Sequence, residues 1–167
     1  MILGIYILKM LSQAKDASQI EIEEDQVEQN LSDILKINDA VDDLKIGVVI
    51  HDATPDIFSK YQESSILLLT SRYEPFGLVL PEAMSCGLPV VAFDCPYGPS
   101  DIITDGVDGF LVKGRDVHVF AQKVSALIES QQMRVQMGRE GIHSARRYEA
   151  ERIIPMWVTL FRQLSEE

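Results

Sequence analysis

The sequence contains few cysteines and no metal-binding pattern. Cys86 and Cys95 are the only cysteines among 167 residues, no CxxC pair is present, and the three histidines lie far apart. Structural zinc sites use closely spaced cysteine and histidine ligands. We therefore expect no structural zinc site, and no disulfide if the protein resides in a reducing compartment.

Long hydrophobic runs are also absent. The longest apolar runs, at residues 66–69 and 88–93, are as long as strands, whereas a helix needs about 20 apolar residues to cross a bilayer. Residues 1–11 are apolar but lack the basic start and the small-residue cleavage site of a signal peptide. We therefore expect a soluble cytoplasmic protein that forms one domain over residues 1–167.

Basic side chains are in the minority. The chain has fifteen Lys and Arg residues against twenty-six Asp and Glu residues, so its net charge is −11. This charge argues against non-specific binding to nucleic acids and against docking on anionic membranes. Many acids cluster at residues 21–28 and 39–43. We interpret these clusters as solvated helix faces rather than as metal ligands.

Strand-like and helix-like patterns alternate along the chain. Short apolar segments predict strands at residues 1–8, 44–50, 66–70, 89–93 and 110–112. Amphipathic segments predict helices at residues 18–36, 54–64, 115–130, 131–147 and 149–164, with shorter helices ending near residues 86 and 104. Strands that alternate with helices indicate an α/β fold, which we predict to be a Rossmann-like, doubly wound parallel sheet of about five strands with a C-terminal helical tail.

The order of the strands in the sheet follows from connection rules. We predict that the strand at residues 1–8 lies centrally, between those at residues 44–50 and 66–70, followed by those at residues 89–93 and 110–112. The right-handed crossover rule and the need to bury both apolar strands support this order. Direct pairing of residues 66–70 with residues 44–50 would contradict it.

The most specific feature of the sequence is the turn that follows the strand at residues 66–70. Glu74 and Glu82 bracket a segment that leads from this strand into a helix, at the sheet edge where open α/β folds bind ligands. The first N–H groups of a helix lack partners and favour a phosphate, and Gly77 permits close approach of a ligand. Carboxylates suit hydroxyl donors, so a nucleotide-sugar would satisfy both kinds of group. The spacing alone is a weak signal, because Glu82 would also stabilise its own helix dipole.

Residues 71–92 closely resemble the nucleotide-sugar signature of the retaining glycosyltransferase family 4, and the resemblance continues through residues 94–103 and 105–112. It covers about residues 44–150, with a divergent part at residues 1–43 and a C-terminal helix at residues 149–167. The resemblance implies the donor-binding domain of a GT-B glycosyltransferase. It also implies transfer from a nucleotide-diphosphate sugar with retention, without a metal or another cofactor.

The resemblance implies a role for each matching residue. Glu74 would contact hydroxyls of the donor sugar as the catalytic residue, and Glu82 would contact the ribose. The backbone amides of the loop between them would approach the diphosphate. These amides belong to Phe76, Gly77, Leu78 and Val79.

The chain departs from the family pattern in two ways. The resemblance does not include the N-terminal acceptor domain of the family, and no segment before Glu74 reproduces the arginine and lysine that bind the diphosphate in the family. We therefore expect a shortened donor domain that is not competent alone. It would work with an acceptor-domain partner chain or as a homo-oligomer through its C-terminal helix. The alternatives are a non-catalytic nucleotide-sugar-binding or assembly module, a remnant of a longer glycosyltransferase and, with less support from the motif, a nucleotide-sugar epimerase.

Several other side chains allow two interpretations. Arg72 and Arg115 are able to approach a phosphate, but surface arginines are usually solvated. Tyr73 and Tyr97 would either stack on a base or pack within their loops, and His51 ends a strand at the expected ligand edge. Large apolar residues at helical spacing near the C-terminus are expected in the core or in an interface. These are Met156, Trp157 and Phe161.

Overall fold

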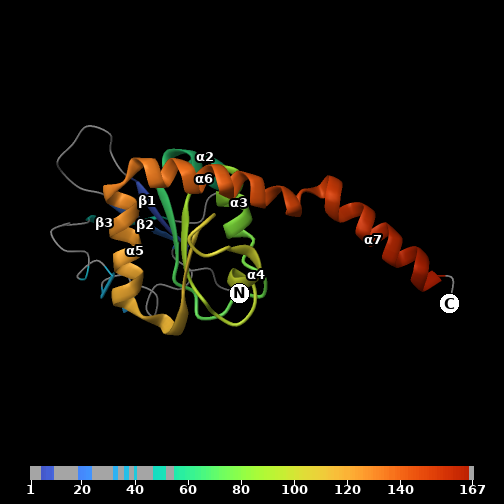
Figure 1. The fold of residues 1–167 in the computed structure, drawn as a ribbon, viewed down its shortest axis with the longest axis horizontal. Coiled ribbons are helices and arrows are strands. Elements are labelled where there is room, and N and C mark those ends of the chain that lie inside the picture. Colours follow the sequence, from blue (N-terminus) through green and yellow to red (C-terminus); the bar gives the residue numbers. More distant parts are fainter. Residues whose placement is uncertain are drawn as a thin grey trace.

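The computed structural model describes residues 5–9, 19–23, 32–33, 36–37, 40, 47–51 and 55–165 (Figure 1). Within these ranges six strands form one sheet. The strands are β1 (Ile5–Lys9), β2 (Gln19–Glu23), β3 (Gly47–His51), β4 (Ile66–Leu69), β5 (Val90–Phe93) and β6 (Phe110–Val112).

Helices follow most of the strands. The α-helices with described bounds are α2 (Ile57–Glu63), α3 (Val79–Ser85), α4 (Pro99–Ile102), α5 (Val117–Glu129), α6 (Gln131–Ala145) and α7 (Ala150–Ser165). Two short 3-10 turns, η2 (Lys113–Arg115) and η3 (Arg146–Tyr148), precede α5 and α7. Residues 32–33, 36–37 and 40 are also helical.

The strand order is β3-β2-β1-β4-β5-β6. Strands β4, β5 and β6 are parallel, as are β2 and β3, whereas β1 runs antiparallel to both of its neighbours. The α/β fold class is confirmed. The prediction of a wholly parallel sheet of about five strands needs correction, because the described sheet has six strands and β1 is reversed.

The central placement of the N-terminal strand is confirmed, since β1 pairs directly with β4 and β3 does not. Its predicted position next to the strand at residues 44–50 is wrong, because β2 lies between β1 and β3. Its direction follows from the length of the connection to β2. The segment between Lys9 and Gln19 is shorter than the dozen or more residues that a parallel crossover needs. A reversed β1 allows a short connection and still lets β2 and β4 run in the same direction.

The predicted helix over residues 18–36 is wrong at its start, because Gln19–Glu23 forms strand β2. These five residues alternate polar and apolar, so Ile20 and Ile22 share one face of a strand. They lie opposite Leu8 and Tyr6 of β1. Further along, residues 32–33 and 36–37 are helical, which agrees with the later part of the prediction.

The core lies on both faces of β4 and β5, whose residues are all buried. Ile66, Leu68 and Phe93 belong to one hydrophobic cluster, which is covered by α5. Leu67 and Leu69 belong to a second cluster, which is covered by α3 and α4. Helices therefore pack on both faces of the parallel strands, as in other doubly wound sheets.

Helix α6 packs closely on the end of α3. Gly87 follows α3 with a φ of 76°, and a Cβ atom built at Gly138 of α6 would lie 2.1 Å from its carbonyl oxygen. Only a hydrogen at position 138 permits this approach. One turn further along α6, a Cβ atom at Gly141 would make an ordinary contact of 3.5 Å with Met84.

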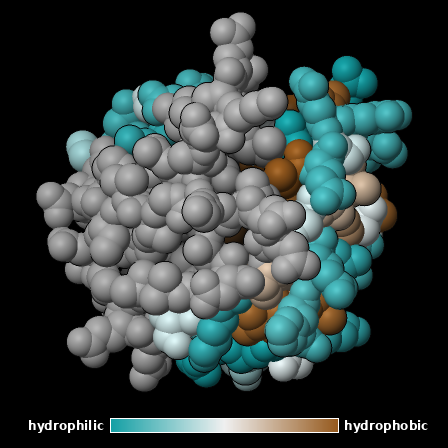
Figure 2. All heavy atoms as spheres, turned by 90° about the vertical axis from the view of Figure 1, so that its left-hand side faces the viewer, coloured by the Kyte–Doolittle hydropathy of each residue, from teal (hydrophilic) through white to brown (hydrophobic). Residues whose placement is uncertain are grey.

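The C-terminal helix α7 projects from the body of the molecule (Figure 1), and none of its residues is buried. Trp157 and Phe161 are 53% and 61% exposed and stack with their ring centroids 5.6 Å apart. Of the two places expected for Met156, Trp157 and Phe161, the core is therefore excluded, and a role in an interface remains a prediction. On the opposite side of the molecule, the described residues at the surface are mostly hydrophilic (Figure 2). Among the described helices, none has the length and apolar content needed to cross a bilayer.

Gly138→Ala should lower the free energy of unfolding by about 2 kcal/mol or more, because the added methyl collides with main chain that cannot rotate away. Gly141→Ala is the matched control in the same helix and should raise it by up to about 1 kcal/mol through helix propensity. Urea denaturation of both variants measures the difference. Equal effects of the two substitutions would contradict the described packing of α6 on α3.

Candidate functional site

The candidate site is the turn between β4 and α3. Gly77 lies in this turn with a φ of 85°. The loop after β5 packs directly on it, because a Cβ atom at Gly98 would lie 2.2 Å from the carbonyl oxygen of Phe76. Two loops that follow neighbouring parallel strands thus meet at the carboxyl edge of the sheet, where ligands bind in open α/β folds.

The turn presents backbone donors. In the described part of the chain, no acceptor receives the N–H groups of residues 76–79. Leu80 is the next residue, and its N–H group donates to the carbonyl of Gly77 over 3.0 Å. Phe76 and Leu78 are exposed, whereas Gly77 and Val79 are buried. The predicted diphosphate-binding amides are therefore unpaired within the described chain.

Glu74 is almost completely buried, with 2% of its surface exposed. Its Oε1 has no hydrogen-bond partner among the described residues, and neither has the hydroxyl of Thr70 or of Ser71. Buried polar atoms are nearly always paired in folded proteins. Three unpaired side-chain oxygens therefore lie within five residues of this turn. Each lowers the free energy of unfolding, because a buried polar atom without a hydrogen bond is unfavourable.

Burial raises the pKa of Glu74. Cys95, which follows β5, is buried beside it. Burial and the Glu74 carboxylate both raise the pKa of the Cys95 thiol, so this cysteine is a small buried apolar group rather than a nucleophile.

Glu82 lies on α3 and is half-buried. Its Oε2 accepts a hydrogen bond of 3.2 Å from the hydroxyl of Tyr61, which is buried on α2. No sequence pattern predicted that Tyr61 would be a partner of Glu82. A carboxylate accepts several hydrogen bonds, so the contact with Tyr61 orients Glu82 and leaves capacity for ligand hydroxyls.

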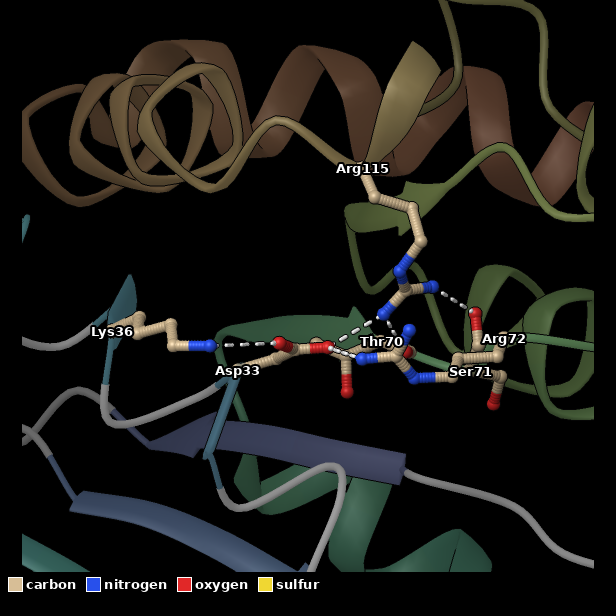
Figure 3. A network of polar contacts seen from close by, with 6 residues as sticks. All are labelled: Asp33, Lys36, Thr70, Ser71, Arg72 and Arg115. Atoms are coloured by element: carbon tan, nitrogen blue, oxygen red, sulfur yellow. Dashed lines mark hydrogen bonds and ion pairs between the residues drawn. The ribbon is translucent and has the colours of Figure 1, made fainter.

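A second set of charged side chains lies beside the turn, around the buried Asp33 (Figure 3). Arg115 Nη2 and Arg72 Nη2 lie 2.7 Å and 3.3 Å from Asp33 Oδ2, and Lys36 Nζ lies 3.8 Å from Oδ1. Arg115 also donates to the main-chain carbonyls of Ser71 and Thr70, over 2.8 Å and 3.0 Å. This cluster places three cations around one carboxylate.

The expectation that both arginines are solvated is wrong for Arg115, whose side chain is only 26% exposed, whereas that of Arg72 is 55% exposed. The contacts of Arg115 could not be predicted from the sequence, because its acceptors are remote in the chain. The one local signal is the turn at Gly114, where both Gly114 and Arg115 have positive φ angles.

The remaining aromatic candidates pack within the protein. Tyr73 and Tyr97 meet edge to face with their ring centroids 6.4 Å apart, and Phe76 meets Tyr148 in the same way at 5.4 Å. These contacts favour loop packing, and stacking on a base stays a prediction. His51 ends β3 at the same sheet edge as the turn, but β2 and β1 separate it from β4.

No metal site is evident in the described residues. No group of three or more His, Cys, Asp or Glu side chains among them could hold an ion.

Glu74→Gln should stabilise the folded chain at pH 7.5 by about 1 kcal/mol, because it replaces a buried carboxylate, whose Oε1 has no partner among the described residues, by a neutral group. Since the folded state raises the pKa of Glu74 above its ordinary 4.5, the folded state binds the proton more tightly than the unfolded state. The stability of the wild type should therefore fall, relative to the variant, as the pH rises from about 4.5. Thermal melts at pH 4 and pH 7.5 measure this, and an advantage of the variant that is equal at both would contradict it.

Comparison with known proteins identifies the family. A model of the family "Glycosyl transferases group 1" matches residues 22–144, so the match begins within β2. The poly(ribitol-phosphate) alpha-N-acetylglucosaminyltransferase of Staphylococcus aureus is 36% identical over 103 residues, which is 60% of this chain and 20% of that protein. The chain thus spans about a fifth of the length of this relative.

Solved structures show the same fold. A mutant of S. aureus TarM in complex with fondaparinux, alpha-GlcNAc-glycerol and UDP superposes with a TM-score of 0.76 at 22% identity, covering 93% of this chain and 38% of that one. Anabaena HepE in complex with UDP and glucose gives a TM-score of 0.62 at 27% identity, covering 74% and 33%. Because the family model matches well over half of its residues, the chain belongs to the group 1 glycosyltransferases and has their GT-B-like α/β fold.

Proposed function

We propose that the turn between β4 and α3 binds a nucleotide-diphosphate sugar and that the chain is the donor domain of a retaining glycosyltransferase of family 4. The observation that carries this proposal is the combination of unpaired N–H groups at residues 76–79 with the buried, unpaired Oε1 of Glu74. The first group suits an anion and the second suits a hydroxyl. Two structural neighbours contain UDP, which has a diphosphate and hydroxyl-bearing ribose.

Each group has a separate role in this proposal. The amides of residues 76–79 would receive the diphosphate, and Glu82, oriented by Tyr61, would accept from the ribose hydroxyls. Glu74 would accept from a hydroxyl of the donor sugar and hold the sugar for transfer. Because Glu74 is buried, the sugar reaches it only when the side chains around it move aside.

The departing diphosphate gains negative charge as the bond to the sugar breaks. Fixed backbone donors already aimed at this position stabilise that charge without reorganisation. We propose that these donors, rather than a metal ion, supply the stabilisation, and that no cofactor takes part. Both cysteines are free, which suits the reducing cytoplasm where we place the reaction.

We further propose that transfer requires an acceptor-binding domain beyond the chain described. The chain spans about a fifth of the relative compared above, and a donor site without a covering domain is open to water, which weakens its electrostatic contacts. A non-catalytic nucleotide-sugar-binding module is the second candidate function. Both candidate functions predict that the 167-residue chain binds the donor without transferring the sugar. They are distinguished by a transfer assay with an acceptor domain added, because only a donor domain of an enzyme should then transfer the sugar.

The exposed apolar face of α7 is the proposed attachment point for the partner. It carries Trp157 and Phe161 and has no described contact with the core. A helix with this much exposed apolar surface usually marks an interaction site. The partner would be an acceptor domain or a second copy of the chain.

Calorimetry with UDP, GDP and ADP, and with the corresponding nucleotide-glucose compounds, should reveal binding of one of the three nucleotides. For that nucleotide, Glu82→Ala should weaken affinity about tenfold or more, because a charged contact to the ribose hydroxyls is lost. Glu129→Ala, an exposed acid on α5, is the control and should change affinity less than twofold. Equal affinity of wild type and Glu82→Ala would refute the assigned role of Glu82.

A double substitution, Trp157→Ser with Phe161→Ser, tests α7. If the partner is a second copy, light scattering at rising concentration should show dimers for the wild type and monomers for the variant. Because α7 does not pack on the core, the melting temperature should change by less than about 2 °C. A wild type that stays monomeric would exclude the second copy as the partner.

A further inference from the structure

Arg115 holds the main chain at the start of the candidate loop. Its guanidinium donates to the carbonyls of Thr70 and Ser71 (Figure 3), which come after the end of β4. The ladder between β4 and β5 ends at the pair Leu69 and Ala92. The two carbonyls therefore lie beyond the sheet and need a donor from elsewhere, and Arg115 provides it.

The backbone of Arg115 adopts a conformation that residues with a Cβ atom disfavour. Its φ is 55°, immediately after Gly114 with a φ of 67°. Such strained residues persist where surrounding contacts hold them, and they cluster at functional sites. Here the contacts are the two carbonyls, the 2.7 Å bond to Asp33 and the ring of Phe93, whose centroid lies 4.5 Å from the guanidinium carbon.

The guanidinium faces protein acceptors on several sides. Its hydrogen bonds go to Asp33, Thr70 and Ser71, and its face covers Phe93. This arrangement suits a group that acts through the loop rather than one that touches the donor. Arg72 shares the same Asp33 oxygen but has no described bond to a carbonyl, so it serves as a matched control.

The loop is fixed separately on the other side of Glu74. There the backbone of Gly98 packs closely against the carbonyl of Phe76, and Leu80 is bonded to Gly77. Loss of Arg115 would therefore release the stretch from Ser71 to Pro75 and leave the beginning of α3 in place.

We propose that Arg115 is a positioning residue for Glu74: it fixes the carbonyls of Thr70 and Ser71 and thereby the place of the carboxyl group three residues later. This inference rests on the proposed function of the turn. Through Glu74, Arg115 would affect binding of the sugar part of the donor and not binding of the nucleotide part. The affinity gained from the sugar should therefore depend on Arg115, while the affinity for UDP should not.

The first test compares UDP and UDP-glucose as probes by calorimetry on the 167-residue chain. Arg115→Gln should weaken UDP-glucose at least tenfold and UDP less than twofold. Arg72→Gln should change either affinity less than twofold. A loss that is equal for both probes, or no loss for either, overturns the proposal.

The second test needs no ligand. Hydrogen–deuterium exchange at the amides of residues 72–74 should be at least tenfold faster in Arg115→Gln than in the wild type, with exchange in α6 unchanged. Unchanged exchange at residues 72–74 overturns the proposal. A wild type that binds neither probe would refute the proposed function instead, and the exchange comparison would still decide the role of Arg115.

Arg115→Lys is a second variant for both tests, in case Arg115→Gln does not fold. Lysine keeps the charge but cannot span the acceptors that the planar guanidinium joins, so it should show the same pattern in both tests with smaller changes. If neither variant folds, the residue serves the fold as a whole and the proposal is wrong.

Discussion

Burial of β4 and β5 on both faces is the constraint on which the rest of the structure depends. Helices cover each face of these strands, so polar side chains have no place along them. The first polar residues after β4 are Thr70 and Ser71, at the carboxyl edge of the sheet. Helix α3 begins a few residues later, and the unpaired N–H groups of residues 76–79 lie at its start, at the same edge. Because both faces of β4 and β5 are buried, the polar groups lie together at the carboxyl edge of the sheet.

The same edge is where the structure departs from what stability alone favours. Three buried oxygens lack partners, and Arg115 holds a left-handed backbone conformation. Local conflicts of this kind are expected at functional sites in otherwise consistent structures. The contact between Tyr61 and Glu82 and the bonds from Arg115 to the two carbonyls are the features that keep the turn in one arrangement despite these costs.

The sequence predicted the parts of the fold that depend on local patterns. The apolar runs of β4 and β5 and the glycine after α3 are signals of that kind, and the central place of β1 followed from connection rules. The strand at Gln19–Glu23 was not predicted, because it is part of a longer acidic segment whose apolar residues have helical spacing. Arg115 and Asp33 could not be paired from sequence, because that contact arises only when distant elements meet at the sheet edge. Glu74 and Glu82 were found through the motif, and their roles remain proposals.

The central claim is that the turn between β4 and α3 is the binding site of a nucleotide-diphosphate sugar. A crystal structure of the chain with UDP tests it most directly. We predict diphosphate density within hydrogen-bond distance of the amides of residues 76–79 and ribose hydroxyls on Glu82. Nucleotide density elsewhere on the protein, with this turn unchanged and empty, would contradict the account.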